Sequence, residues 1–348
     1  MTQATVPDAL VGAVEAAARA LGSAVASVGQ ARGNPIGAPG VARRVARVAL
    51  ADGRVVAVKV SARDAPAARE AATLRFLHGR GASVAQPLAW GDDGDGWLAT
   101  VWAGDVTLDA ALAGASDAPV EALGLGLVEA LATVEAAFAP LTAVGAPPGA
   151  VATARELIAP WVEAAPPALE WLGVEARWAS VAYVAASGEA AIASPLTVGP
   201  LDYHAGNVVT GASTTIVDLA AVGWDWPARR VAQYTFATGA SPGGTFRSAL
   251  ARPVVEAAAS MLALVHGGSK ARWLEAIAAH ALVLVATAAW HLRAVATGRA
   301  DPERMASWGD VDRRRASLKA VAESLAPLRP HRYLRQALAL PSATPNHR

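Results

Sequence analysis

The first hundred residues contain short runs of apolar residues whose spacing changes from helical to alternating and back. The Asp52-Gly53 dipeptide separates two β-rich runs and is typical of a tight hairpin turn. Pro66 suits the first turn of the helix that follows. The predicted elements are a helix at residues 8–22, a hairpin at 43–60, a helix at 66–79, and strands at 84–90 and 97–102. We therefore expect a small lobe of three or four strands with an inserted helix.

After Gly104 the chain becomes rich in Ala, Leu and Glu, which favour helices. The predicted elements here are helices at residues 108–140 and 151–185, a short β-like segment at 196–218, and helical structure over 228–340. Pro147-Pro148 and Pro166-Pro167 are expected to interrupt the helices. The pattern predicts an α+β protein with a β-rich N-terminal lobe at residues 1–104 and a mainly helical C-terminal lobe at 105–348.

The amino-acid composition excludes several classes of function. The net charge is +1, so no overall positive field favours nucleic acid. The sequence has no cysteine, which excludes disulfides, thiolate metal sites and a cysteine nucleophile. The longest uncharged stretch, residues 276–292, is shorter than a membrane span of about 20 residues and predicts a buried helix. The N-terminus does not resemble a signal peptide, and we expect a cytoplasmic protein without a membrane partner.

The candidate chemistry lies in the β-like segment. Two short apolar strands, Val208–Val209 and Thr215–Val217, flank the polar turn T-G-A-S at residues 210–213. Asp202 and Asn207 precede the first strand, and Asp218 follows the second. A hairpin brings such ends to one edge. Phosphoryl transfer needs one carboxylate to orient a hydroxyl and accept its proton, and an amide oxygen and a second carboxylate to hold Mg²⁺. The alternative is a structural hairpin whose Asp and Asn side chains stabilise turns.

A lysine in the N-terminal lobe fits the same chemistry. Lys59 ends the apolar run V-V-A-V-K, which is similar to the V-A-I-K strand of kinases, whose lysine neutralises the α- and β-phosphates. A partly buried lysine needs an acidic partner, and Glu70 on the predicted helix at 66–79 is the candidate. The alternatives are a solubilising lysine on an edge strand and an exposed helix carboxylate.

The whole segment resembles the catalytic core of the aminoglycoside phosphotransferase and choline kinase-like families, relatives of protein kinases. Their pattern is H-G-D-x-H-x-G-N, a hairpin, and I-D-W-E-D-A-G-x-G-D-P-A. The positions that match here are Asp202, His204, Gly206, Asn207, Asp218, Gly223, Pro227 and Ala228. The resemblance covers roughly residues 40–235. It implies a two-lobed protein kinase-like fold, with Asp202 as the catalytic residue and Asn207 and Asp218 as Mg²⁺ ligands.

Four positions depart from this pattern. The first His and the Gly are replaced by Pro200 and Leu201, the acid near the end by Trp226, and a later Asp by Arg230. In the family these positions mainly support the loop through hydrogen bonds. Their replacement keeps open a second hypothesis, a catalytically degenerate nucleotide-binding pseudokinase of the same fold.

The resemblance also implies cofactors and their contacts. We expect ATP and Mg²⁺, with the backbone near Val101 and Ala103 binding adenine at a hinge between the lobes. The Gly/Pro-rich stretch at residues 33–40 is a candidate phosphate-covering loop, or a plain loop. Lys59 and Glu70 complete the nucleotide site.

The acceptor is expected to be a small molecule with a hydroxyl group, such as a sugar, an amino sugar or an amino alcohol. Eight residues separate Asp218 from Pro227, too few for the activation segment of a protein kinase. Residues 231–348 contain fifteen Lys and Arg against seven Asp and Glu, which favours a neutral or anionic acceptor over an aminoglycoside. No nucleic acid partner is expected, and the protein is predicted to be a monomer or homodimer.

Overall fold

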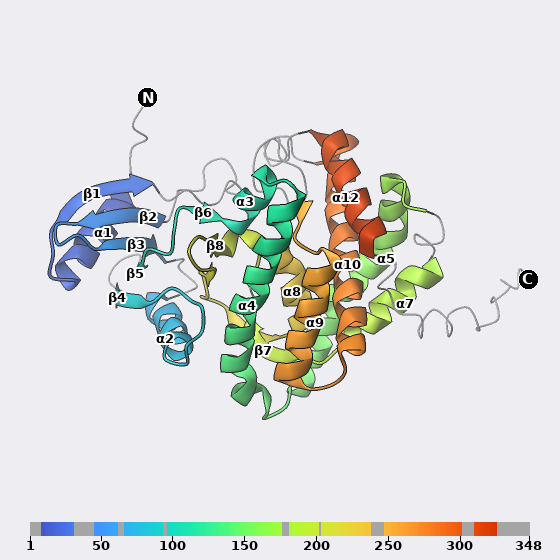
Figure 1. The fold of residues 1–348 in the computed structure, drawn as a ribbon, viewed down its shortest axis with the longest axis horizontal. Helices are drawn as coiled ribbons and strands as arrows, with labels where there is room; N and C mark the ends of the chain where they lie inside the picture. The colour runs from blue at the N-terminus through green and yellow to red at the C-terminus, as the bar shows by residue number, and fades with distance from the viewer. Residues whose placement is uncertain are drawn as a thin grey trace, which may run out of the picture.

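A five-stranded antiparallel sheet forms one lobe, and long helices form a second, larger lobe beside it (Figure 1). The fold is that of a computed structural model, which describes residues 8–30, 45–61, 66–92, 96–175, 181–201, 203–237, 247–300 and 310–325. The predicted α+β architecture, with a β-rich N-terminal lobe and a mainly helical C-terminal lobe, is confirmed. The boundary at residues 104 and 105 stays a prediction.

The sheet of the smaller lobe has the order β1-β2-β3-β5-β4. Its strands are β1 (Val25–Gln30), β2 (Val45–Leu50), β3 (Val55–Val60), β4 (Pro87–Gly91) and β5 (Trp97–Val101). The predicted hairpin at Asp52-Gly53 joins β2 to β3, and Gly53 has a φ of +88°, which suits glycine. The sequence predicted three or four strands, and β1 is the additional one. Its residues are largely exposed, so no buried face marks it in the sequence.

Different helices pack against the two faces of this sheet. Alternate residues of β2 and β3 are buried against α1 (Asp8–Ala20), with Val56 and Val58 almost fully covered. The remaining positions of β3, Val55, Ala57 and Lys59, point to the opposite face. There α2 (Ala67–His78) packs against β4 and β5. The strand alternation therefore directs Lys59 toward the helix that carries Glu70.

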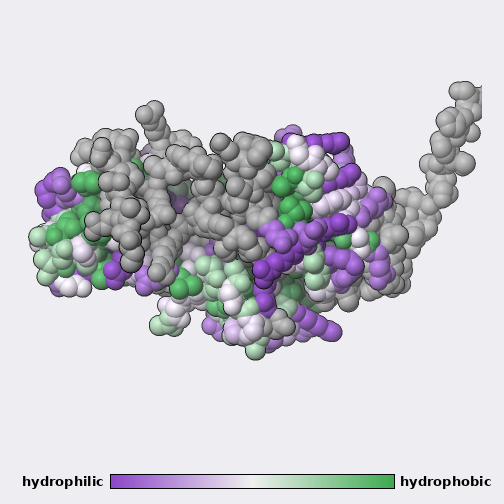
Figure 2. Space-filling model, turned by 90° about the horizontal axis from the view of Figure 1, so that it is seen from above, coloured by the Kyte–Doolittle hydropathy of each residue, from purple (hydrophilic) through white to green (hydrophobic). Residues whose placement is uncertain are grey.

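The larger lobe is built on long helices: α3 (Leu108–Gly114), α4 (Asp117–Thr142), α5 (Pro148–Leu172), α7 (Val181–Ile192), α8 (Pro227–Thr235), α9 (Arg252–His266), α10 (Lys270–Ala296) and α12 (Val311–Leu325). The break predicted at Pro166-Pro167 is wrong, because α5 continues to Leu172. Ala165, Ala168 and Leu169 of α5 are buried with residues of α10, and this packing holds the helix together across the prolines. From above, hydrophilic side chains gather where α12 lies (Figure 2).

In the part of the chain that the structure describes, two helices are long and apolar enough to cross a membrane by length and composition, namely Ala118–Thr142 and Lys270–Ala296. Half of the apolar window of the first and 72% of that of the second are buried inside the protein. The prediction of a buried helix over residues 276–292 is confirmed, since those residues lie in α10 and most are covered.

Short strands connect this helical lobe to the smaller one. The hairpin of β8 (Val208–Thr210) and β9 (Thr215–Ile216) is the one predicted from the sequence, and β6 (Val106–Thr107) extends it along β8. A second pair, β7 (Thr197–Pro200) and β10 (Val222–Asp225), was not predicted. These pairs bring the segments on both sides of Asp218 onto the same end of the helical lobe.

A buried ion pair fixes α8 against α4. Arg230 Nε and Nη2 donate to the two carboxylate oxygens of Glu135 at 2.7 and 3.0 Å, and both side chains are essentially inaccessible to solvent. Arg230 also donates to Thr197 of β7 and to the backbone oxygen of Asp225, while His266 Nε2 lies 2.9 Å from Glu135 Oε2. Burial opposes ionisation of Glu135, but Arg230 and His266 outweigh it and lower the pKa of Glu135 from 4.5 to about 2.

Replacing Arg230 by Met should destabilise the protein by about 3–5 kcal/mol, because it leaves the Glu135 carboxylate buried without its main partner. The free energy of unfolding is measured in urea at pH 7 and again between pH 5 and 2. Because the pKa of Glu135 is depressed, its stabilising effect in the wild type is complete above about pH 4.5 and is lost as the pH falls toward 2.

The matched control is Arg252→Met, which removes the exposed ion pair with Glu256 and should cost about 1 kcal/mol or less. If both single variants lose the same small amount of stability, the buried pair does not organise this lobe.

Candidate active site

Lys59 joins the two lobes through a pair of carboxylates. Its Nζ donates to Glu70 Oε2 at 2.8 Å and to Asp218 Oδ1 at 2.5 Å. Lys59 comes from β3, Glu70 from α2, and Asp218 from the segment after β9, 159 positions further along the chain than Lys59. The structure thus brings together three of the residues that the sequence predicted for one site.

The charges of this cluster affect one another. Burial alone would lower the pKa of Lys59, but Glu70 and Asp218 outweigh it and raise that pKa above its ordinary value. Burial raises the pKa of Glu70, against the attraction of Lys59, and the nearby Asp218 acts in the same direction as burial. One ammonium group therefore faces two carboxylates, and an added cation would relieve the excess negative charge.

The hairpin places Asn207 next to Asp218. Asn207 ends a short 3₁₀ turn, η1 (Ala205–Asn207), and its backbone oxygen accepts the N–H of Val217 at 2.9 Å. Asp218 follows with a φ of +59°, and it is the one non-glycine residue with positive φ in the described part of the chain. Such a conformation is uncommon for residues other than glycine and clusters at functional sites. The positive φ indicates that the surrounding structure imposes this conformation and so fixes the position of the Asp218 carboxylate.

The turn before Asn207 is tightly packed around His204. Its Nδ1 accepts the N–H of Gly206 at 3.1 Å. A Cβ atom on Gly206 would lie 2.8 Å from His204 Nδ1 and 3.3 Å from Asp109 Oδ2, so glycine is required for this close approach. Asp109 at the start of α3 is buried and accepts hydrogen bonds from Thr107 and the N–H of Ala110. These contacts fix the loop that leads into the hairpin.

Asp202, the predicted catalytic residue, lies outside the described residues. Its chain neighbour Tyr203 is buried, and the Tyr203 hydroxyl donates to Asp225 Oδ2. Asp225 Oδ1 accepts a hydrogen bond from the N–H of Trp226 at 2.8 Å, and Asp225 Oδ2 accepts one from Arg229 Nη1 at 3.1 Å. The Tyr203–Asp225 hydrogen bond thus ties the segment containing Asp202 to the strand that follows Asp218.

The segment is held by other contacts at Pro200, Trp226 and Arg230, the positions that depart from the family pattern. Pro200 pairs with Val222 in the β7–β10 ladder, Trp226 is buried, and Arg230 has Glu135 as its partner. The loop therefore has hydrogen-bonded supports of its own, which the sequence did not predict. A glutamate isolated in the apolar run of residues 130–139 was the available signal, because a buried charge requires a partner.

At the predicted hinge between the lobes, two backbone N–H groups already have hydrogen-bond acceptors. The N–H of Val101 already donates to the backbone oxygen of Gln86 at 2.9 Å, and that of Trp102 to Val55 at 3.2 Å. The binding of adenine by the backbone near Val101 and Ala103 stays a prediction. The candidate phosphate loop at residues 33–40 lies outside the described residues.

The donor set suits Mg²⁺. No group of three or more His, Cys, Asp or Glu side chains in the described part of the chain could hold a metal ion. Mg²⁺ is usually bound by one or two carboxylates together with phosphate oxygens, rather than by a cage of protein ligands. A carboxylate at Asp218 and an amide oxygen at Asn207 match that requirement.

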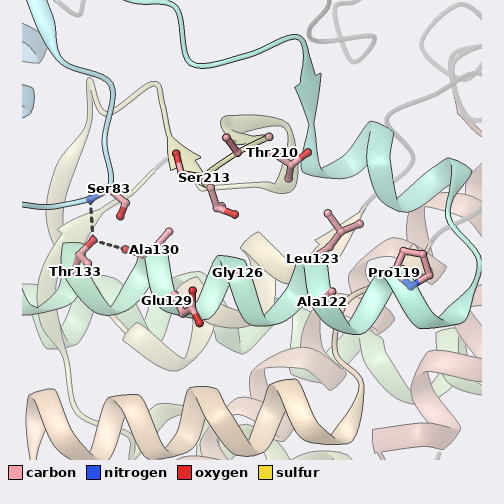
Figure 3. Close-up of a pocket in the computed structure, with 13 residues that line it drawn as sticks. Ser83, Pro119, Ala122, Leu123, Gly126, Glu129, Ala130, Thr133, Thr210 and Ser213 are labelled. Carbon is pink, nitrogen blue, oxygen red and sulfur yellow. Dashed lines mark hydrogen bonds between the residues drawn. The ribbon is translucent and has the colours of Figure 1, made fainter.

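A hollow of about 600 Å³ lies elsewhere, between α4 and the turn of the β8–β9 hairpin (Figure 3). Its wall bears the hydroxyls of Ser83, Thr133 and Ser213 and the carboxylate of Glu129. Of the predicted site residues that the structure describes, none lines it. The hydrogen bond from the Ser83 N–H to Thr133 Oγ1, at 2.8 Å, anchors the loop after α2 to α4.

The described residues combine three features: two lobes, a lysine–glutamate pair in the smaller lobe, and a hairpin in the larger lobe with Asn207 and Asp218 at its ends. No family model matches the sequence, and no curated protein matches it. Among solved structures, a Ralstonia eutropha JMP134 protein assigned as an aminoglycoside phosphotransferase aligns with a TM-score of 0.51 at 14% identity. The alignment covers 91% of this chain and 98% of that protein.

Two further structures are similar. The macrolide 2′-phosphotransferase of Brachybacterium faecium has a TM-score of 0.46 and 19% identity, with 86% of this chain and 97% of that one covered. An ethanolamine kinase of Plasmodium vivax has a TM-score of 0.43 and 10% identity, with coverages of 84% and 80%. The Ralstonia structure shows that this chain has the kinase-like fold of that protein, and the predicted resemblance is confirmed at that level.

Replacing Asp218 by Asn should abolish Mg²⁺-dependent nucleotide binding, because the substitution removes the charged oxygen donor while keeping the size of the side chain. The dissociation constant of an ATP analogue is measured by calorimetry with and without Mg²⁺. Asp312→Asn, at an exposed position of α12, is the control and should bind as the wild type does. Unchanged Mg²⁺ dependence in Asp218→Asn would show that the metal assignment is wrong.

Proposed function

We propose that this chain is a Mg-ATP-dependent phosphotransferase that moves the γ-phosphate to a hydroxyl group of a small molecule, such as a sugar, an amino sugar or an amino alcohol. The observation that carries the proposal is the contact of Lys59 with both Glu70 and Asp218. A lysine held between a helix carboxylate and a metal-binding aspartate across two lobes is the arrangement that positions nucleoside phosphates in kinases.

Each residue has a distinct part in the proposed reaction. The Asp202 carboxylate accepts a hydrogen bond from the acceptor hydroxyl and takes its proton as the oxygen forms a bond to the γ-phosphorus. The bond between that phosphorus and the bridging oxygen of ADP breaks in the same displacement. Asn207 and Asp218 would hold Mg²⁺, which neutralises phosphate charge when bound, and Lys59 would neutralise the α- and β-phosphates.

A pseudokinase of the same fold is the second candidate. Pro200 and Leu201 favour it, because they replace two residues of the family pattern beside Asp202. The buried Tyr203–Asp225 and Arg230–Glu135 contacts oppose it, since they support the segments that flank the proposed reacting groups. The two candidates differ in whether phosphate is transferred, which a product assay measures.

Replacing Asp202 by Ala should lower the rate of phosphoryl transfer by several orders of magnitude and leave ATP affinity nearly unchanged, because the carboxylate acts on the acceptor and not on the nucleotide. Phosphorylated product is measured with wild type and variant against a panel of sugars, amino alcohols and nucleosides. Tight nucleotide binding with no product from any acceptor would favour the pseudokinase.

Tyr203→Phe tests whether the loop support affects catalysis. The substitution removes one hydroxyl, and we expect kcat to fall by about tenfold, as the loss of one hydrogen bond to a charged group implies. The nucleotide dissociation constant should change little, while the melting temperature should fall, because the buried Asp225 carboxylate loses one donor.

Tyr234→Phe makes the same chemical change in a buried tyrosine of α8 whose ring lies 5.8 Å from that of Tyr203, and it is the matched control. Equal losses of kcat in the two variants would contradict a specific positioning role for Tyr203.

A further inference from the structure

The hollow between α4 and the turn of the β8–β9 hairpin has the dimensions of a ligand site (Figure 3). Its volume of about 600 Å³ lies within the roughly 300–1,000 Å³ that is typical of pockets for small molecules. About 20 water molecules of the liquid take up the same space, so a monosaccharide or disaccharide fits. The hollow is separate from the proposed nucleotide site, because neither Lys59 nor Glu70 nor Asp218 lines it.

Hydrogen bonds fix the walls of this hollow to one another. The N–H of Ser83 donates to Thr133 Oγ1 of α4 at 2.8 Å, and the backbone oxygen of Ser83 accepts the N–H of Ile216 in β9 at 2.9 Å. Ser83 therefore ties the loop after α2 to both the helix and the hairpin. A ligand that enters the hollow meets walls that are already in place, which lowers the entropy that binding costs.

A glycine in the interior of α4 allows the hairpin to approach the helix. Gly126 occupies a position where glycine is less favourable for helix stability than alanine. A Cβ atom on Gly126 would lie 2.9 Å from Thr214 Oγ1. The close approach of the Thr214 hydroxyl, one of the groups that line the hollow, therefore accounts for the glycine.

The polar side chains that line the hollow are mainly hydroxyls. They come from the loop after α2, from α4 and from the hairpin: Ser83, Thr133, Thr210, Ser213 and Thr214. Thr133 and Thr210 already donate to backbone oxygens. Among the described residues, none pairs with the other three hydroxyls. Because a hydroxyl both donates and accepts, this lining suits a ligand with several hydroxyls of its own.

The charge of the lining favours a cationic group on that ligand. Of the described residues that line the hollow, Glu129 alone is charged, and its side chain lies at an exposed position of α4. A phosphate or carboxylate group of a ligand would meet a like charge there and no cation, whereas an ammonium group would be attracted. Leu123 and Pro119 add an apolar surface that the carbon–hydrogen face of a sugar ring can cover.

We propose that this hollow is a second ligand site, which binds a small polyhydroxyl compound that carries one amino group. The free hydroxyls of Ser83, Ser213 and Thr214 exchange hydrogen bonds with the hydroxyls of the ligand, and the Glu129 carboxylate pairs with its ammonium group. Binding at this site requires neither a nucleotide nor a metal ion. The proposal therefore stands apart from the proposed phosphotransferase function.

The test compares three probes of similar size and different charge: glucosamine, glucose and glucose 6-phosphate. Each is titrated into the full chain at pH 6, without nucleotide or metal, and its dissociation constant is measured by ligand-observed NMR. We expect glucosamine to bind about fivefold more tightly than glucose, which is the upper end of what an exposed ion pair contributes, and glucose 6-phosphate to bind most weakly. Raising the salt concentration should reduce the difference between glucosamine and glucose.

Two variants assign the binding energy to residues of the hollow. Glu129→Gln should raise the dissociation constant of glucosamine to that of glucose and leave the value for glucose unchanged. Thr214→Val removes a hydroxyl at nearly constant size and should weaken both probes by about fivefold. Glu121→Gln makes the same change as Glu129→Gln at an exposed position of α4 outside the hollow, and it is the matched control.

The absence of cysteine from the sequence allows the site to be located directly. Ala212→Cys places a single thiol at an exposed position of the hairpin turn that lines the hollow. Saturating glucosamine should slow the alkylation of that thiol by iodoacetamide. Ala136→Cys, at an exposed position of α4 that does not line the hollow, is the control and should react at the same rate with and without the probe.

Three results would overturn the proposal. The first is a hollow that binds none of the probes, and the second is glucosamine that binds equally well to Glu129→Gln and Glu121→Gln. The third is loss of glucosamine binding in Asp218→Asn, which would place the ligand at the nucleotide site instead. Failure of phosphate transfer to every acceptor bears on the proposed function alone, because none of these binding measurements depends on it.

Discussion

The contact of Lys59 with Glu70 and Asp218 is the interaction on which the rest of the site depends. It joins a strand and a helix of the small lobe to the segment that follows the β8–β9 hairpin of the large one. Lysine is costly to bury, and the two carboxylates keep it charged where a nucleotide's phosphates would lie. Without this contact, the hairpin with Asn207 and Asp218 and the sheet would each present isolated polar groups. With it, polar groups from both lobes lie together at one place.

Buried polar contacts in the large lobe hold the other half of this arrangement in place. Arg230 and Glu135 join α8 to α4, and Tyr203 and Asp225 join the loop of Asp202 to the strand after Asp218. A buried ion pair contributes little net stability relative to apolar packing, but removing one partner is strongly destabilising. Such contacts therefore select one geometry, and here they fix Tyr203, β10 and α8 relative to α4.

Local patterns predicted much of this, and contacts between distant residues account for what they missed. Strand alternation around Asp52-Gly53 places Lys59 on the face toward α2, and the polar ends of the β8–β9 hairpin come together because a hairpin forces them to. The apolar run around Glu135 signals a buried charge, but its pairing with Arg230 could not be predicted, since the two residues are 95 positions apart. The continuation of α5 through Pro166 depends on packing against α10, which no local propensity contains. Strand β1 was missed because its exposed residues show no buried face.

The central claim is that Lys59, Asn207 and Asp218 hold the phosphates and metal of one nucleotide. A crystal structure of the protein with a non-hydrolysable ATP analogue and Mg²⁺ tests it most directly. The account predicts a Mg²⁺ ion about 2.0–2.1 Å from oxygens of Asn207, Asp218 and the phosphates, with Lys59 retaining its contact with Glu70. A nucleotide bound away from Lys59, or a metal ion bound without Asp218, would contradict it.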